Sequence, residues 1–508
     1  PMRTTWFKRL LRESNPPAEF VAAVSHVGGV GLRGVDDDGA EGARHDKLEQ
    51  AREGHQPRPY QAIGHEATAE RRDGAQQEED SAGRSRPMAA CRPALYVYEL
   101  PNRYRHEGKP HGSGFGVPVA SPPGLPIAAL YSATTYGTGA AFFETALKHR
   151  CRTWVPAKAD LYFVPTFTDS FRTQNVCVDA APGQPKNCSR DALFRRLAAV
   201  HNGSGVSYLD ARGGADHILL TGHQGFWFDL KPSYEVSYRD RRLRGAMLFS
   251  VEEGVRYPWP GPTTSSGIHS TPWSSIVHLA SSTPREELPW RSTHNRSVLV
   301  AGAFATHRAV GPASKQFNNL RGALHRACLR RVDRCEYASP GAALGVAGIA
   351  SLYWRAVFCL QPVGDGVSRA GIIDAVLLGC IPVLFHPGQH LQWPWHWGSW
   401  VRRATVTLDM HRVVNGLLDP IEALAAVPPG RIASMQMMIA EHGHCLHYDR
   451  DDNTTHAVRQ MPNALDITLH GSWLHTRGIR RNFSRADLCT HDSVVIRHRA
   501  TEDRLRSR

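Results

Sequence analysis

The stretch AVFCLQPVGDGVSRAGIIDAVLLGCIPVLF, residues 356–385, decides the fold of this chain. It opens on Ala356 to Gln361, a short apolar run with the length of a buried strand. Residues 381–385 form a second run of the same kind. Between the two runs, residues 362–367 carry two glycines and predict a loop. The stretch therefore predicts two buried strands with a connection between them.

A helix is predicted in this connection, after the loop. Ser368 is a residue type that caps helix N-termini, and Gly379 lies where a left-handed glycine ends a helix. The apolar positions in between recur at helical spacing: Ile372, Ile373, Val376 and Leu377. Strand, loop, helix and strand make a βαβ unit, whose strands we expect to be parallel and connected right-handedly.

The loop of such a unit is where open α/β sheets bind ligands, at the carboxyl end of the first strand. Free N–H groups and the helix dipole favour an anion there. Arg369 follows in the first helical turn, and a guanidinium can hold two phosphate oxygens. Gly364 and Asp365 of the loop join this candidate anion site, although Asp365 also fits a turn residue. The alternative for Arg369 is a solvated surface side chain, and its position alone does not decide.

Asp374 lies among apolar neighbours in the segment IIDAVLL. A carboxylate buried without partners is unfavourable. Asp374 therefore either caps a backbone group locally or accepts hydrogen bonds from a pair of ligand hydroxyls, such as those of a ribose. We favour the ligand.

The quoted stretch resembles the signature of the exostosin-type glycosyltransferases of family 47, and within them the plant xyloglucan galactosyltransferase branch. The matching elements are FCLQP, GD, SR, the acid at 374 and GCIPV ahead of Phe385. The resemblance implies an inverting, nucleotide-sugar-dependent Golgi enzyme with the GT-B fold, in which two Rossmann-like α/β domains face a central cleft. The chain departs from the family at residues 371–373, where bulkier residues are more usual.

Other blocks resemble the family in the same order along the chain, from ALYVYELP at residue 94 onward. We expect an N-terminal acceptor domain at residues 91–285, closed by a strand at 274–284, and a C-terminal nucleotide-sugar domain at 286–445. Residues 1–90 are dense in small and charged residues, which predicts a disordered stem. Residues 446–508 are polar and rich in His and Arg, which predicts a peripheral tail.

An inverting transfer needs a base for the acceptor hydroxyl. Three residues of the first domain are candidates: Glu144 on a predicted helix, Asp169 after a predicted strand and His223 in a loop. Nothing in the sequence ranks them, and Glu144 also fits a solvated helix face. His217, in a predicted strand, fits a core histidine better than a functional one.

The transfer also needs positive charge for the departing diphosphate. Arg308 and Arg321 fall where the family places basic residues, and they join Ser368 and Arg369 at the predicted diphosphate site. The alternative for Arg321 is an ion pair on a helix surface. Because these side chains supply positive charge, we expect no cofactor and no metal beyond the UDP-sugar donor, which is a substrate.

Four tryptophans gather at Trp393, Trp395, Trp397 and Trp400. Their rings can stack on a sugar, or they can form a hydrophobic plug. Three histidines lie nearby, but no carboxylate or cysteine accompanies them at ligand spacing, so we do not predict a metal site.

The composition limits the partners. The chain has 508 residues, a formal net charge of +13 and 41% hydrophobic residues, which suits two domains and an acidic partner. No RNA-binding signature and no zinc-finger spacing is present, so nucleic acid is not expected. An activated sugar nucleotide and a polysaccharide acceptor fit better.

The cysteines and the start of the sequence bear on the cellular compartment of the protein. Among ten cysteines, Cys359 and Cys380 occupy predicted strand positions and are expected to be buried thiols. Others could pair in an oxidising lumen, with Cys328 and Cys335 the closest partners. No apolar run of about 18 residues is present. Because the sequence begins with Pro1 before Met2, we expect that the N-terminal anchor implied by the family, which would place the catalytic domain in the Golgi lumen, is missing from it.

We therefore expect transfer of a galactose-like sugar from a UDP-sugar to a cell-wall or matrix polysaccharide. The alternative is a non-catalytic subunit of a polysaccharide synthase complex that binds a nucleotide sugar or a glycan. A phosphate-binding hydrolase is disfavoured, because the chain has no nucleophile elbow and no Walker loop.

Overall fold

The computed structural model describes residues 91–100, 116–132, 137–165, 190–220, 245–252, 268–306, 314–339, 344–364, 366–450, 461–478 and 488–489. All of them belong to one compact unit, Arg86–Arg508. The predicted stem at residues 1–90 lies outside the described residues and stays a prediction.

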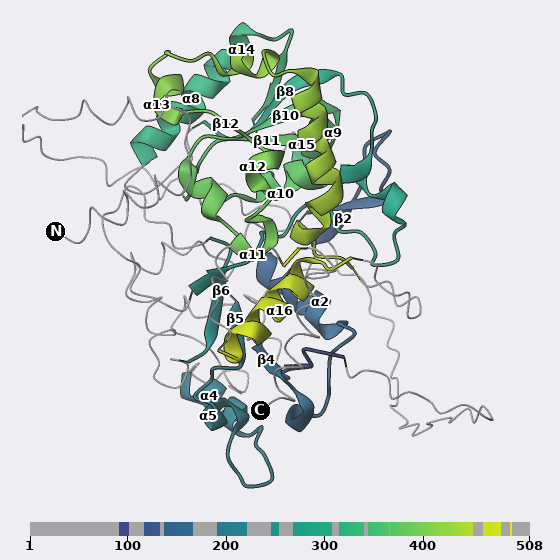
Figure 1. Ribbon diagram of the computed structural model, residues 1–508, viewed down its shortest axis with the longest axis vertical. Helices are drawn as coiled ribbons and strands as arrows, with labels where there is room; N and C mark the ends of the chain where they lie inside the picture. The colour runs from purple at the N-terminus through teal and green to yellow at the C-terminus, as the bar shows by residue number, and fades with distance from the viewer. Residues whose placement is uncertain are drawn as a thin grey trace, which may run out of the picture. The chain divides into compact units, whose positions relative to one another are not determined.

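The N-terminal half holds a parallel sheet of five strands in the order β1-β4-β5-β6-β7 (Figure 1). The strands are β1 (Leu95–Val97), β4 (Leu161–Val164), β5 (His217–Leu220), β6 (Met247–Ser250) and β7 (Ile268–Ser270). The three central strands are buried along their whole length, as expected where both faces of a parallel sheet are covered. A small antiparallel pair, β2 (Val117–Ala120) and β3 (Ala129–Ser132), is separate from this sheet.

The C-terminal half holds a second parallel sheet, in the order β12-β11-β10-β8-β9. The strands are β8 (Val298–Ala303), β9 (Cys335–Ala338), β10 (Ala356–Gln361), β11 (Ile381–Leu384) and β12 (Val406–Thr407). From β8, the chain adds β9 on one side and then β10 on the other. The direction of strand addition therefore reverses between β8 and β10. In open α/β sheets, ligands bind next to the carboxyl ends of the strands at such a switch point.

The predicted βαβ unit is confirmed. Strand β10 has the predicted bounds, it pairs in parallel with β11, and α10 (Ala370–Leu377) connects them. Gly379 follows the helix in the left-handed conformation, with φ 69°. The predicted cap is wrong: Arg369 is the N-cap residue, without a side-chain bond to the helix, and the Ser368 hydroxyl bonds elsewhere.

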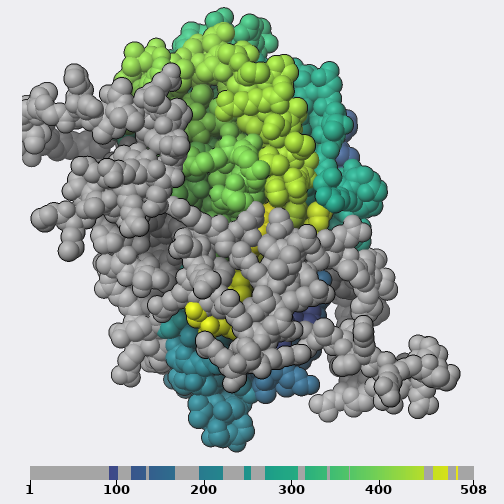
Figure 2. Space-filling view, in the orientation of Figure 1, coloured from purple at the N-terminus to yellow at the C-terminus, as the bar shows by residue number. Residues whose placement is uncertain are grey.

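Helices accompany both sheets. The longer ones are α2 (Thr138–Leu147), α4 (Arg190–Ala198), α8 (Ser314–Arg330), α9 (Gly345–Arg355), α15 (Pro429–His442) and α16 (Ala464–Thr476), and the shorter ones include α11 (Pro394–Trp397), α12 (Val401–Ala404), α13 (Met410–Val414) and α14 (Pro420–Ala425). Helix α15 forms part of the outer surface of the C-terminal half, where most of its side chains are exposed or half-buried (Figure 2). The α/β fold class with two Rossmann-like parallel sheets is confirmed.

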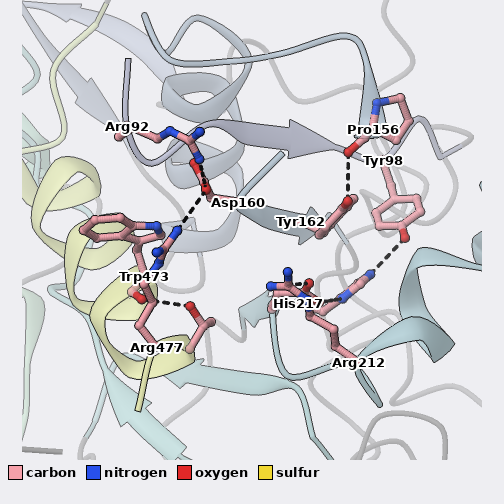
Figure 3. A network of polar contacts seen from close by, with 11 residues as sticks. Arg92, Tyr98, Pro156, Asp160, Tyr162, Arg212, His217, Trp473 and Arg477 are labelled. Atoms are coloured by element: carbon pink, nitrogen blue, oxygen red, sulfur yellow. Dashed lines mark hydrogen bonds and ion pairs between the residues drawn. The ribbon is translucent and has the colours of Figure 1, made fainter. Parts of the chain in front are cut away.

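The prediction of a peripheral tail after residue 445 is wrong for residues 461–478. Helix α16 buries most of its side chains, and it contacts α2 and β4 of the N-terminal half. Asp160, at the start of β4, makes ion pairs with Arg92 and with Arg477, which follows α16 (Figure 3). The Arg477 guanidinium also lies 4.7 Å from the centre of the Trp473 ring. The polar composition hid this packing, because buried polar side chains of α16 bond within the helix or to neighbours.

The prediction of a strand at 274–284 is also wrong. Strand β7 ends at Ser270, and the residues that follow leave the sheet. Their polar groups bond to residues of other elements instead: the Trp273 indole to Ser368 ahead of α10, the Ser274 amide to Thr138 of α2 and the Ser275 hydroxyl to Asp374 of α10. Residues 271–278 follow strand β7 of the N-terminal sheet and make hydrogen bonds to α10 and to the residue ahead of it. We call these residues the crossing loop.

Four disulfides lie among the described residues: Cys91–Cys151, Cys328–Cys335, Cys359–Cys380 and Cys445–Cys489. Cys328 and Cys335, the closest candidate partners in the sequence, are joined. The prediction that Cys359 and Cys380 are thiols is wrong, because parallel pairing of β10 with β11 brings their Cα atoms to 5.9 Å. No described helix is both long and apolar enough to cross a membrane.

Candidate active site

Two arginines hold the carboxyl ends of β8 and β10 together. Arg321 of α8 donates from Nε to the Val363 carbonyl and from Nη1 to the Ala305 carbonyl, each at 2.9 Å. Arg369 donates from Nη1 to the Pro362 carbonyl and from Nη2 to the Ala303 carbonyl, each at 3.1 Å. Both guanidiniums therefore lie at the point where the order of strand addition reverses, which is the ligand-binding edge of such a sheet.

Glycines let the backbone approach these guanidiniums closely. A Cβ atom at Gly364 would lie 2.7 Å from Arg321 Nη2. At Gly371, a Cβ atom would lie 2.8 Å from Gln361 Oε1 and 3.1 Å from Arg369 Nε. The glycine at 371 thus gives the Arg369 side chain room over the first turn of α10.

Arg369 keeps donors for a ligand. Its two bonds to carbonyls use one hydrogen of Nη1 and one of Nη2, and a guanidinium carries five N–H donors. Burial lowers the pKa of Arg369, while the Tyr353 hydroxyl and the Asp374 carboxyl oppose that shift. An oxygen-rich anion would complete the hydrogen bonding of this cation and stabilise its charge.

Ser368, ahead of α10, is bound by two residues of the N-terminal half. Its backbone N–H and its hydroxyl both donate to Glu252 Oε2, at 2.9 and 3.0 Å. Its hydroxyl oxygen accepts from the Trp273 indole N–H at 3.0 Å. Glu252 lies two residues after β6, so the carboxyl end of a strand in the first sheet meets the N-terminus of α10 in the second half.

Asp374 is likewise bound from the N-terminal half. Its Oδ1 accepts from the Ser275 hydroxyl at 2.8 Å and from the Ile276 N–H at 3.0 Å. Burial raises the pKa of Asp374 to about 6, although these two hydrogen bonds and Arg369 act in the opposite direction. The carboxylate thus binds a backbone group, but one 98 residues away and not a local one. Its predicted role at a ribose stays a prediction.

The other predicted site residues are less informative. Asp169, His223, Arg308 and Asp365 lie outside the described residues. Glu144 is half-buried on α2, in the N-terminal half.

His217 is a core histidine with side-chain partners. It is fully buried, and its ring nitrogens lie 2.8 Å from Asp216 Oδ1 and 2.9 Å from the Tyr98 hydroxyl (Figure 3). The Tyr162 ring stacks on it at 4.8 Å. This network belongs to the packing of the first sheet.

The family follows from comparison with known proteins. Residues 91–418, more than half of the chain, match the family model described as the exostosin GT47 domain. The chain belongs to the exostosin GT47 family. The predicted family is confirmed, and with it the class of enzyme, a glycosyltransferase.

Curated relatives of this GT47 chain come from Arabidopsis thaliana. The probable xyloglucan galactosyltransferase GT15 is 22% identical over 428 residues, which cover 77% of this chain and 84% of the relative. The probable xyloglucan galactosyltransferase GT17 is 27% identical over 348 residues, covering 65% and 68%. The xyloglucan-specific galacturonosyltransferase 1 is 26% identical over 302 residues, covering 56% and 40%.

Among solved structures, the chain matches the pneumococcal O-GlcNAc transferase GtfA in complex with UDP and GlcNAc. That chain has a TM-score of 0.25 and 9% identity, with 47% of this chain and 56% of the other covered. The OtsA apo structure has a TM-score of 0.27 and 11% identity, with coverage of 63% and 77%.

The four tryptophans of the GT47 chain form a plug. All are buried, and the indole N–H groups of Trp393, Trp397 and Trp400 donate to backbone carbonyls. The Trp393 indole reaches Val251 of the N-terminal half at 2.9 Å. These rings therefore fill the contact between the two halves of the chain and present no face to a sugar.

The nearby histidines are not assembled into a metal site. His390 Nε2 lies 3.0 Å from the Thr407 hydroxyl, and His396 Nε2 lies 3.1 Å from the Ala464 carbonyl. Within the described ranges, one group has ligand spacing for a metal ion: His444, Cys445 and Cys489. Its two sulfurs are joined in a disulfide, which removes the thiolates that would bind the ion.

A cavity of about 260 Å³ lies apart from the arginines. It is lined by the linker between the halves and by residues around His447 and Asn463. Trp290 in its wall lies beside Gly379, at the C-terminal end of α10, whereas Ser368 lies at the opposite end. The cavity is therefore no part of the arginine site.

Sequence reasoning missed Glu252 and the crossing loop. Glu252 follows the apolar run MLFSV, so the pattern of a buried strand with a polar residue at its end could have found it. The crossing loop carried no such signal, since its sequence fits a strand equally well.

Proposed function

We propose that this glycosyltransferase moves a sugar from a UDP-sugar to a hydroxyl of a polysaccharide, with inversion at the anomeric carbon. One observation carries the proposal: Arg321 and Arg369 converge at the switch point of the second sheet, beside the loop between β10 and α10. A nucleoside diphosphate is the anion that this combination of cations, loop and helix N-terminus suits best.

In the proposed reaction, the acceptor oxygen attacks the anomeric carbon while the bond from that carbon to the diphosphate breaks. The electron pair leaves with UDP, so negative charge grows on the diphosphate. Arg369 and Arg321 would stabilise this charge from fixed positions, which lowers the barrier. The proposal uses these two cations and requires no metal ion. Asp374 keeps its proposed role at the ribose through Oδ2.

The sugar is proposed to be galactose-like, and the acceptor a cell-wall or matrix polysaccharide. The names of the relatives support this choice, since several are xyloglucan galactosyltransferases. One relative is named a galacturonosyltransferase, so UDP-galacturonic acid is the second donor to test.

We place the enzyme in the Golgi lumen, held by an N-terminal anchor. The four disulfides support an oxidising compartment of this kind, because disulfides persist there and not in the cytosol.

The test compares Arg369→Ala with the wild-type chain. We expect UDP affinity to fall at least tenfold and sugar transfer to fall about 100-fold, the size of effect seen when one stabilising donor is removed. Calorimetry measures the binding, and released UDP with acceptor analysis measures the transfer. Arg355→Ala is the matched control, because Arg355 lies in the same half and its ion pair with Glu336 is exposed.

Unchanged turnover in Arg369→Ala would refute the donor site. UDP binding without transfer to any acceptor would favour the alternative of a non-catalytic nucleotide-sugar-binding subunit.

A further inference from the structure

An internal carboxylate occupies the N-terminus of α10. Glu252 Oε2 accepts both the N–H and the hydroxyl of Ser368. The carboxylate is also packed against the loop, because a Cβ atom at Gly366 would overlap Glu252 Oε2. Glu252 is 3% exposed, so its carboxyl group lies inside the protein and not at its surface.

The donors that hold this carboxylate are those that the proposed function gives to the diphosphate. The loop N–H groups and the helix N-terminus form one anion site, and two anions cannot share the same hydrogens. The carboxylate comes from β6 of the N-terminal half, whereas the loop belongs to the C-terminal half. The first half of the chain thus supplies an anion to the donor-binding loop of the second.

We propose that Glu252 is a placeholder anion at the loop between β10 and α10, residues 362–369, which we call the donor loop. Glu252 binds Ser368 of this loop when no donor is bound, and the diphosphate of the donor displaces it. This inference rests on the proposed function. It makes the affinity for the donor depend on the competition of two anions for the N–H and hydroxyl of Ser368. The donor would prevail because its proposed site also includes Arg321 and Arg369, two cations at the carboxyl ends of β8 and β10.

The arrangement suits a placeholder better than a catalytic base. Glu252 Oε2 already accepts two hydrogen bonds from Ser368, next to the N-terminus of α10. A base would instead face the acceptor hydroxyl. The two roles predict different effects of removing the charge of Glu252. A placeholder opposes donor binding, so removing its charge should tighten donor binding, whereas removing the charge of a base should not.

The test is Glu252→Gln in the full chain. The glutamine carbonyl oxygen can still accept both bonds from Ser368, so the fold and the contact between the halves are kept. The negative charge beside the diphosphate is lost. We expect UDP to bind about tenfold more tightly, because removing a nearby like charge relieves its repulsion. Calorimetry is carried out with UDP and, separately, with uridine, which carries no phosphate and should bind the variant and the wild type equally.

Glu336→Gln is the matched control, because it removes the same charge from an exposed ion pair in the C-terminal half. It should leave UDP affinity unchanged. Equal UDP affinity of Glu252→Gln and the wild type would show that Glu252 does not oppose binding of the diphosphate, and it would overturn the proposal. Unchanged affinity with lost turnover would show a base and overturn it too. Loss of the proposed function is recognised separately, because the wild type would then fail to bind UDP in an Arg369-dependent way.

Discussion

Gly371 shows how a single missing side chain positions a cation. The Arg369 guanidinium lies over the first turn of α10, and a Cβ atom at 371 would lie 3.1 Å from its Nε. We expect Gly371→Ala to move this side chain and to weaken UDP binding about tenfold. The free energy of unfolding should change little, because the higher helix propensity of alanine offsets the strain by up to about 1 kcal/mol. Calorimetry and thermal unfolding separate the two effects.

Gly430→Ala is the control for that substitution. Gly430 lies in the first turn of α15, and an added Cβ atom there meets nothing within 4 Å. The variant should gain slightly in stability and bind UDP as the wild type does. If Gly371→Ala also binds UDP normally, the close packing at 371 has no part in donor binding.

At the scale of single residues, the local sequence pointed to the arginines of the candidate site but not to Glu252. Ser368 and Arg369 were predicted because a loop and a helix start follow a buried strand, and Arg321 was predicted because it matches a position where the family has an arginine. Glu252 belongs to another sheet, and its contact with Ser368 spans 116 residues. Asp374 was expected to meet a ribose or a local backbone group, and its partners 98 and 99 residues away could not be read from its neighbours.

Among the elements, α10 and its loop are enclosed by a disulfide. Cys359 and Cys380 close a segment of 21 residues that contains the donor loop and the helix. The chain-entropy model gives such a crosslink about 3 kcal/mol of stability. We expect Cys359→Ala with Cys380→Ala to lose about that amount in urea unfolding, and also to lose UDP affinity, because the unlinked loop must be ordered on binding.

The Cys328–Cys335 disulfide supplies the comparison. It closes only 7 residues, for which the same model gives about 2 kcal/mol, and all four cysteines are buried. Replacing this pair by alanine should cost about 1 kcal/mol less and leave UDP affinity unchanged. An equal loss of UDP affinity in both double variants would contradict the link between the enclosed loop and the donor.

Elements with a strong local pattern were predicted well from the sequence. The apolar runs and glycines of residues 356–385 specify β10, α10 and β11 without help from the rest of the chain. The crossing loop and α16 were predicted wrongly for one shared reason. Their conformation depends on partners in distant segments, such as Asp374 for the loop and Asp160 for the residue after α16.

Across the whole molecule, buried histidines make the free energy of unfolding depend on pH. Burial lowers the pKa of His269, His278, His386 and His390 to about 4 and that of His396 to about 3. In the unfolded chain these groups titrate near 6.5, so the unfolded state binds more protons between pH 4 and 6.5. Stability is therefore full above pH 6.5 and falls as the pH is lowered towards 4.

We expect the free energy of unfolding to fall by up to about 2 kcal/mol per buried histidine between pH 7.5 and pH 5, as urea titrations at the two pH values measure. His396→Gln should reduce this fall by about 2 kcal/mol, because one such group is gone. The exposed His411→Gln supplies the control, since it removes one histidine without removing a buried one. A fall of the same size in His396→Gln and the wild type would refute the assignment.

The packing of α16 against α2 and β4 has a consequence for synthesis on the ribosome. The N-terminal half emerges first, but a helix that packs on its sheet is made of residues 464–476, which are synthesised much later. Until these residues have emerged, the nascent first half exposes the apolar surface that they cover. Chaperones would have to protect that surface until α16 has formed.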